Sequence, residues 1–206
     1  MFHVKQFDNF SENVLKKFKI YQQILEKWQS KINLVSQSSL KDAFKRHFLD
    51  SAQLYPLIPE NIKVLLDFGS GAGFPALILA ILNQDKNSSP WSIIMVESDQ
   101  RKCCFMSEVA RLCEVKVDIQ NQRIEQIKGG KADVITARAL ADLKTLLDYS
   151  FPFIHEKSQL LFLKGQGIQA EIQEALKKYD FSYHLFQSQT DEKGQIIQIE
   201  QLKVKD

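Results

Sequence analysis

Three glycines at alternate positions form the most distinctive pattern in the sequence. An apolar run that ends at Asp67 is followed by Gly69, Gly71 and Gly73, and then by another apolar segment, 74–82. A buried strand that turns through glycines into a helix is typical of loops that bind nucleotide-type cofactors. Glycine suits such a loop because it adopts positive φ and lets the backbone approach a ligand. The alternative is a strand-to-helix turn that binds nothing.

The spacing of these glycines distinguishes between two cofactors. A dinucleotide-binding G-x-G-x-x-G pattern that starts at Gly69 would need glycine at position 74, where the chain has Phe74. The pattern D-x-G-x-G-x-G instead resembles the S-adenosylmethionine loop of Rossmann-like methyltransferases. In that loop the third glycine, here Gly73, makes room for the methionine part of the cofactor. The predicted cofactor is therefore S-adenosylmethionine, and a nicotinamide-dependent oxidoreductase is disfavoured.

An acidic residue ends the next apolar run. Residues 92–97 are predicted to form a strand, and Glu97 lies at its carboxyl end. A carboxylate at this position can accept hydrogen bonds from both hydroxyls of a ribose, so Glu97 is the candidate residue for the sugar of the cofactor. The alternative is a solvated acid that a helix N-terminus favours.

The segment after the third predicted strand, 115–120, is a candidate for binding adenine. Backbone groups of Ile124 and Glu125 would contact the edge of the purine, and the Ile124 side chain would lie against its face. The alternative is a short surface helix that Ile124 and Ile127 anchor.

Two basic residues follow at the ends of the remaining predicted strands. Arg138 closes a strand near 132–136, and Lys164 closes a strand at 159–164. Ligands of open α/β sheets bind outside the carboxyl ends of the strands, so both cations can meet a carboxylate or a phosphate there. The alternatives are a structural ion pair for Arg138 and a solvent-exposed lysine for Lys164.

A basic and acidic cluster lies before the glycine loop. Arg46, His47 and Asp50 fall within one and a half turns of a predicted helix, and His47 and Asp50, three apart, can share a face and make contact. The alternative is that this pair ties the helix to the sheet.

The elements that must position these residues follow from hydrophobic periodicity. Two helices are predicted before residue 60, an amphipathic one over 11–28 and a second that starts at Ser39, with a weak capping box, and continues to 55. Strands then alternate with helices, and a terminal hairpin of segments 182–187 and 196–204 follows. The predicted strands are 63–67, 92–97, 115–120, 132–136 and 159–164, and the predicted helices between and after them are 74–83, 99–113, 140–149 and 168–179.

This order predicts an α/β fold, and it resembles the Rossmann-like class I S-adenosylmethionine-dependent methyltransferase variant of the doubly wound sheet. The sheet should be mainly parallel and seven-stranded, with a C-terminal antiparallel hairpin and an N-terminal helical extension. We predict an extension over 1–62, a methyltransferase domain over 63–206 and a surface insertion over 83–90.

Composition limits the class of protein. The chain has 206 residues, 44% of them hydrophobic, which is enough for one α/β domain with an appendage. No apolar run approaches the roughly 20 residues that a bilayer requires, and the start lacks the layout of a secretory signal, so a cytoplasmic protein is expected. Three cysteines fit neither a disulfide framework nor a metal site. The formal net charge of +2 is too small to indicate a nucleic-acid partner by itself.

Several separated motifs together resemble one family, the glucose-inhibited division protein B family of bacterial methyltransferases that modify guanine N7 in small-subunit ribosomal RNA. The resemblance covers roughly 30–165 and departs beyond, where many members have a basic residue ahead of the last strand. The motifs that carry it are Asn33-Leu-Val-Ser36, Arg46-His-Phe-Leu-Asp-Ser51, Asp67-Phe-Gly-Ser-Gly-Ala-Gly-Phe-Pro75, Glu97 to Phe105, Arg123-Ile-Glu125, Thr136-Ala-Arg-Ala139 and Leu163-Lys-Gly165.

The resemblance implies a function and roles for residues. The acceptor would be a guanine of 16S ribosomal RNA near the decoding region, in free RNA or in an assembly intermediate of the small subunit, and the protein would act as a monomer. Gly69 and Phe74 would border the cofactor, Ile124 and Glu125 would hold its adenosine, and Arg138 would complete the site. The predicted RNA contacts are Arg46, His47, Arg123 and Lys164, within a wider basic set that adds Lys16, Lys17, Lys45 and Arg138.

The predicted reaction needs no general base, because guanine N7 carries a free lone pair and no proton. Catalysis would depend on holding that lone pair in line with the methyl–sulfur bond. Two alternatives remain open from the sequence. A small-molecule methyltransferase would share the cofactor loop but needs no basic helical extension, and a non-enzymatic RNA-binding module would keep the basic residues without methyl transfer.

Overall fold

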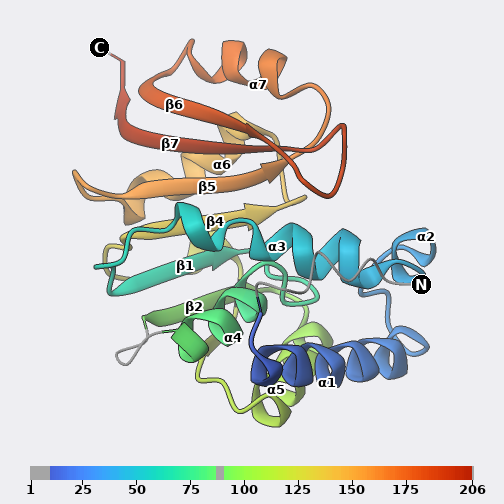
Figure 1. Ribbon diagram of the computed structural model, residues 1–206. Coiled ribbons are helices and arrows are strands. Elements are labelled where there is room, and N and C mark those ends of the chain that lie inside the picture. Colours follow the sequence, from blue (N-terminus) through green and yellow to red (C-terminus); the bar gives the residue numbers. More distant parts are fainter. Residues whose placement is uncertain (1–9, 87–90, 206) are drawn as a thin grey trace.

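A seven-stranded sheet with helices on both faces forms the centre of the structure (Figure 1). The computed structural model describes residues 10–86 and 91–205. The strand order is β3-β2-β1-β4-β5-β7-β6, in which β7 is antiparallel to both neighbours and all other pairs are parallel. The strands are β1 (Val64–Phe68), β2 (Ser92–Glu97), β3 (Asp118–Asn121), β4 (Val134–Arg138), β5 (Gln159–Lys164), β6 (Tyr179–Gln187) and β7 (Gln195–Val204). The predicted fold class, including the hairpin, is confirmed.

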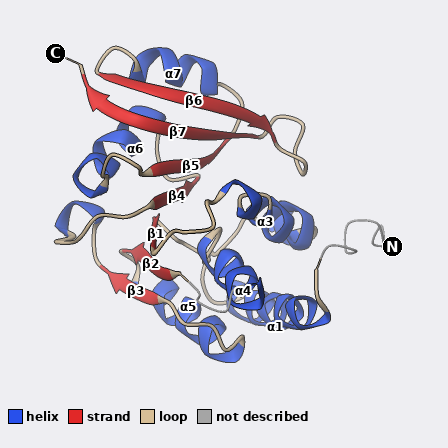
Figure 2. Ribbon diagram, turned by 60° about the vertical axis from the view of Figure 1, so that its left-hand side comes forward, coloured by secondary structure: helices blue, strands red, loops and turns tan. Residues whose placement is uncertain are grey.

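Each face of the sheet has its own hydrophobic cluster. Neighbouring residues of a strand point to opposite faces, so Leu65 joins one cluster and Leu66 the other. The first cluster lies under α4 (Ala76–Lys86) and α5 (Gln100–Leu112), with α1 (Glu12–Gln29) packed on these two helices. The second lies under α6 (Leu143–Ser150) and α7 (Ile168–Ala175). Figure 2 shows α6 on the other side of the sheet from α4. The carboxyl ends of the parallel strands are thereby left for a ligand.

Helix α1 supports the glycine loop from behind. Ser11 is its N-cap, with a side chain that accepts a hydrogen bond from the Val14 amide. The buried Tyr21 ring lies parallel to the Phe74 ring, with centroids 5.1 Å apart, and its hydroxyl donates to the Ala72 carbonyl. Phe48 packs edge-on against Phe74 at 5.5 Å. The predicted amphipathic helix is confirmed, and its buried face fixes the loop that follows β1.

The second predicted helix is wrong in its start and its continuity. Ser36, not Ser39, caps the short helix α2 (Gln37–Leu40), because its side chain accepts from the Ser39 amide. A π-helical segment, Phe44–Leu49, then leads into α3 (Asp50–Ala52). Each π-helical turn holds more residues than an α-helical turn, so the faces expected from α-helical spacing shift.

Two further predictions concern boundaries. Helix α4 continues to Lys86, so residues 83–86 of the predicted surface insertion are helical, and residues 87–90 lie outside the described part of the chain. The division at residue 62 stays a prediction, since α1 and the sheet contribute to the same cluster. No helix in the described ranges is long and apolar enough to cross a membrane.

Gly73 offers a test of how the loop is packed. Its φ is +83°, and a Cβ there would lie 2.7 Å from the Tyr21 hydroxyl and collide with Leu77. We expect Gly73→Ala to lower the free energy of unfolding by roughly 2–4 kcal/mol, because backbone strain adds to overpacking. Urea denaturation measures this difference. Gly130→Ala is the control, since a Cβ at Gly130 meets nothing within 4 Å, and a change below about 0.5 kcal/mol is expected. Equal effects of the two substitutions would contradict the packing described.

Candidate functional site

A cavity of about 790 Å³ lies at the carboxyl ends of the parallel strands and is within the size range of ligand pockets. Its walls come from the glycine loop, the ends of β2, β4 and β5, the segment 34–50, and the turn between β6 and β7. It brings together the predicted cofactor residues Gly69, Gly71, Phe74, Glu97, Ile124, Glu125 and Arg138, and the predicted RNA contacts Arg46, His47, Arg123 and Lys164.

Gly73 is the one predicted cofactor residue that does not line this cavity. The position of its missing Cβ faces Leu77 and Tyr21 in the core, so this glycine serves close packing between the loop and α1. Gly71, rather than Gly73, is the glycine that faces the cavity and leaves room for a ligand. It lines the cavity, its φ is +55°, and a Cβ there would meet only the Gly69 carbonyl, at 3.6 Å.

A buried carboxylate lies beneath the loop. The two oxygens of Asp67 accept hydrogen bonds from the hydroxyls of Ser70 and Thr136, each at 2.6 Å. Burial raises the pKa of Asp67 to about 7, although both hydrogen bonds lower it. Asp67 therefore fixes the loop to β4 through hydroxyl groups.

Glu97 is buried at the cavity wall, which excludes a solvated position. Its Oε2 accepts from the Gly71 amide at 2.9 Å, and its Oε1 accepts from the Asp99 amide at 2.8 Å. A carboxylate oxygen can accept more than one hydrogen bond, so both oxygens can still accept from hydroxyl groups of a ligand. This geometry fits a ribose.

The segment predicted to bind adenine is a single 3₁₀ turn, Ile124–Gln126. Ile124 and Ile127 both pack against the second cluster, so the alternative of an anchored surface turn is correct as a description of its packing. Ile124 and Glu125 also line the cavity, and Glu125 accepts a hydrogen bond from the Tyr149 hydroxyl at 3.0 Å. The anchoring positions the turn at the cavity without excluding contact with a ligand.

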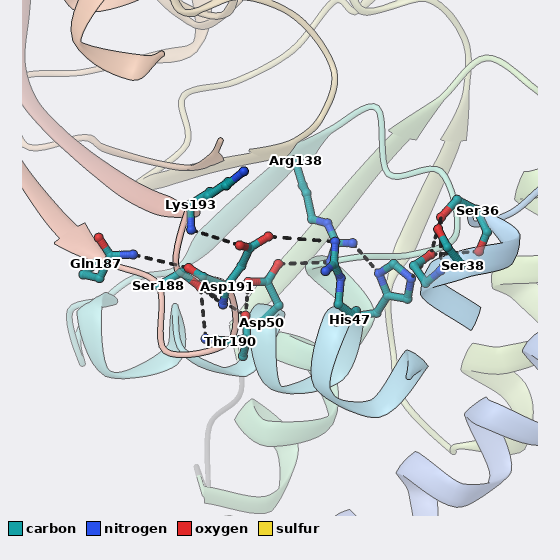
Figure 3. Close-up of polar contacts among 12 residues, drawn as sticks. Ser36, Ser38, His47, Asp50, Arg138, Gln187, Ser188, Thr190, Asp191 and Lys193 are labelled. Carbon is teal, nitrogen blue, oxygen red and sulfur yellow. Dashed lines mark hydrogen bonds and ion pairs between the residues drawn. The ribbon is translucent and has the colours of Figure 1, made fainter. Parts of the chain in front are cut away.

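Arg138 is the central cation of the cavity (Figure 3). Its Nη1 lies 3.3 Å from Asp50 Oδ2, its Nη2 donates to His47 Nδ1, and its guanidinium lies 5.6 Å from the centroid of the Phe74 ring. Burial lowers the pKa of Arg138, and Asp50 opposes this effect. The structural ion pair left open by the sequence is therefore present, on a side chain that still faces the cavity.

His47 is neutral, and its tautomer follows from its partners. A guanidinium can only donate, so Nδ1 accepts from Arg138, and the protonated Nε2 donates to the Ser39 hydroxyl at 3.0 Å. Burial and the charge of Arg138 lower the pKa of His47 to about 3. Both His47, in the π-helical segment, and Asp50, at the start of α3, contact Arg138 at the end of β4 rather than each other. This agrees with the alternative that the pair ties the helix to the sheet. A buried neutral imidazole also offers no positive charge to a phosphate.

The other three predicted RNA contacts differ in exposure. The Lys164 side chain is only 9% exposed and pairs with Glu171 at 2.6 Å, so the alternative of a solvated lysine is wrong and its charge is already compensated. Arg123 is exposed. The Arg46 side chain is 52% exposed, with a 3.8 Å contact to Asp191. Arg46 and Arg123 therefore remain accessible at the mouth of the cavity.

Sequence reasoning missed the contribution of the turn between β6 and β7. Ser188, Thr190 and Asp191 line the cavity, and Ser188 and Thr190 are buried although their side chains are polar. Their partner Asp50 lies 138 and 140 residues away in the sequence, and no local pattern encodes such a contact. Three neighbouring polar residues in a hairpin turn were the only available signal.

The fold and the cavity define a class of protein, the class I S-adenosylmethionine-dependent methyltransferases. Solved structures with this fold align with the chain at low sequence identity. A ribosomal protein L11 methylase from Lactobacillus delbrueckii subsp. bulgaricus matches with a TM-score of 0.60 and 18% identity, over 74% of this chain and 76% of that one. TYW2 from M. jannaschii, solved in complex with AdoMet, matches with a TM-score of 0.59 and 14% identity, over 85% and 80%.

Sequence comparison gives the family. The family model for GidB, rRNA small subunit methyltransferase G, matches residues 14–198. The ribosomal RNA small subunit methyltransferase G of Paramagnetospirillum magneticum is 42% identical over 93% of this chain and 91% of its own length. That of Gluconobacter oxydans is 44% identical over 87% and 90%. The chain belongs to the GidB family of rRNA small subunit methyltransferases G, as the motifs predicted.

Asp67 and His47, both buried, have opposite effects on how the free energy of unfolding depends on pH. The folded pKa of Asp67 is about 7, so between about pH 4 and 7 the native state keeps a proton that the unfolded state releases, and stability falls as pH rises. The folded pKa of His47 is about 3, so below about pH 6.5 the unfolded state takes up the extra proton, and stability falls as pH falls.

We expect Asp67→Asn to remove the first dependence, since an amide keeps a partner for each hydroxyl. The stability of the variant relative to the wild type should then rise with pH by up to about 1.4 kcal/mol per unit between pH 5 and 6.5. Urea unfolding at several pH values gives this difference. A difference that stays constant across the range would contradict the buried, protonated state of Asp67.

Proposed function

We propose that this protein transfers the methyl group of S-adenosylmethionine to N7 of a guanine in 16S ribosomal RNA, near the decoding region. The observation that carries the proposal is the single cavity in which the glycine loop and Glu97 face walls built by the N-terminal helices and the C-terminal hairpin turn. One end suits a nucleoside cofactor, and the other leaves space for an acceptor base. Membership in a family of rRNA small subunit methyltransferases supports the choice of acceptor.

The residues at the loop end fit the cofactor. Glu97 would accept from the ribose hydroxyls, Ile124 and Glu125 would bind the adenine, and the loop at Gly69, Gly71 and Phe74 would follow the rest of the ligand. Arg138 lines the cavity, and its Nη1 pairs with Asp50 at 3.3 Å without a well-aligned hydrogen bond, so it retains a donor for a carboxylate of the ligand. When bound, S-adenosylmethionine supplies an electrophilic methyl group on a sulfonium.

The proposed reaction requires no general base, and His47 is not available as one. The lone pair of His47 Nδ1 is engaged by Arg138, and its Nε2 already carries the proton. The contribution of the protein is then to bind, orient and exclude water, so that the guanine lone pair approaches the methyl group in line.

The acceptor side would bind RNA through accessible cations. Arg46 and Arg123 lie at the mouth of the cavity, where phosphates of an exposed RNA loop can approach them. The acceptor would be 16S ribosomal RNA or a small-subunit assembly intermediate in the cytoplasm, and the protein would act as a monomer. In this proposal residues 1–62 form an extension that builds the acceptor wall, and residues 63–206 form the methyltransferase domain.

Methylation in vitro tests the function. The protein is incubated with labelled S-adenosylmethionine and 16S ribosomal RNA or small subunits from cells that lack the gene, and the RNA is digested for mass mapping. We expect one 7-methylguanosine near the decoding region.

Glu97→Gln should weaken S-adenosylhomocysteine binding by roughly 10-fold or more, because charge-assisted hydrogen bonds are lost. Glu108→Gln, at a carboxylate that accepts from Trp28 outside the cavity lining, is the control.

Other outcomes would favour the alternatives. Label in a small metabolite but in no RNA would indicate a small-molecule methyltransferase. RNA binding without methyl transfer to any acceptor would indicate a binding module.

A further inference from the structure

Asp50 connects two sides of the cavity through its two carboxylate oxygens (Figure 3). Oδ2 pairs with Arg138 Nη1 at 3.3 Å, and Oδ1 accepts from the Thr190 hydroxyl at 2.7 Å. Oδ1 also accepts from Gln53 Nε2 at 2.8 Å. One half-buried side chain therefore contacts both the end of β4 and the turn between β6 and β7.

The turn at 188–194 is held against the α3 region by polar contacts. Besides the Thr190 hydrogen bond, the Gln189 amide donates to Gln53 Oε1 at 3.0 Å, and Gln53 Nε2 donates to the Ser188 hydroxyl at 3.2 Å. Ser188 and Thr190 are also hydrogen-bonded to each other at 3.0 Å. The position of the turn at the cavity wall thus depends on Asp50 and Gln53, because a hydroxyl contact has a defined direction and length.

The other partner of Asp50 is equally constrained. Arg138 is also bound to His47 and lies over Phe74, so its guanidinium has little freedom to move independently of the loop. The contacts from Arg138 to Asp50 and from Asp50 to Thr190 consequently fix the β6–β7 turn relative to the end of β4 and the glycine loop. The sequence analysis considered only a contact of Asp50 with His47 and did not connect Asp50 with Arg138 or Thr190.

We propose that Asp50 is a positioning residue for methyl transfer, which fixes the β6–β7 turn relative to Arg138 and so sets the acceptor wall against the cofactor. This inference rests on the proposed function. Methyl transfer requires an in-line approach, and a misplacement of about 1 Å can cost about 100-fold in rate. Asp50 touches neither reactant in this role and acts through Arg138 and Thr190.

The test uses substitutions that separate charge from the turn contact. Thr190→Val removes the hydroxyl but leaves the ion pair with Arg138, whereas Asp50→Asn weakens both. We expect each to lower kcat by roughly 10–100-fold, with KM for RNA and for S-adenosylmethionine within about threefold of wild type. Thr190→Ser should restore most of the rate. The double variant should lose less than the sum of the two single losses, because both substitutions act on the hydrogen bond between Thr190 and Asp50.

Thr145→Val is the matched control. The Thr145 hydroxyl donates to Asp142 Oδ2 at 2.9 Å, a contact of the same kind between residues that do not line the cavity. We expect its kcat to stay within about twofold of wild type. Thermal melting of every variant identifies any loss of folding, and Thr190→Val keeps the proposal testable if Asp50→Asn does not fold.

A second measurement does not depend on activity. Hydrogen–deuterium exchange of the amides in 188–194 should be faster in Thr190→Val and in Asp50→Asn than in the wild type, and unchanged in Thr145→Val. Unchanged exchange, or a kcat within about threefold in a folded Thr190→Val protein, would overturn the role of Asp50. A wild-type protein that methylates no RNA would instead overturn the proposed function, while the exchange data would still decide whether Asp50 fixes the turn.

Discussion

The burial of one cation organises this site. A guanidinium in a mostly enclosed cavity costs free energy unless its charge is compensated and its donors find acceptors. The charge of Arg138 is compensated by the carboxylate of Asp50, its Nη2 donates to the imidazole of His47, and its guanidinium lies over the face of Phe74. These partners come from the π-helical region and the glycine loop, so satisfying one charge fixes segments that are distant in sequence.

The rest of the fold supplies rigid positions for this arrangement. Parallel strands align their carboxyl ends, which places Glu97, Arg138 and Lys164 at one edge. Helix α1 packs Tyr21 against Phe74 and holds the loop from behind. The buried Asp67 joins the loop to β4 through hydroxyl groups rather than through a second buried cation. Each contact restricts the loop from a different direction.

Local patterns predicted the strands and the order of the helices between them, but not the division of segment 36–52 or the part of the cavity wall that the β6–β7 turn forms. The strands 92–97 and 159–164 were predicted with their observed bounds, because alternating or continuous apolar residues reflect burial directly. The start of α2 could not be predicted, since Ser36, Ser38 and Ser39 can all cap a helix by residue type. In the structure Ser36 is the cap, and the Ser39 hydroxyl instead contacts the Ser36 carbonyl oxygen and His47 Nε2. The contacts of Asp50 with the hairpin turn also depend on tertiary structure. The burial of Lys164 follows from Glu171 on α7, which no strand-end pattern reveals.

Binding of S-adenosylhomocysteine to Arg138→Lys, measured by calorimetry, tests the central claim most directly. Lysine keeps the positive charge but lacks the planar fork that reaches Asp50, His47 and a ligand at once. If the guanidinium organises the site, affinity should fall by roughly 10-fold or more, about 1.4 kcal/mol, while the protein stays folded. An affinity within about twofold of the wild type would contradict the account, because a positive charge alone would then be enough to organise the site for ligand binding.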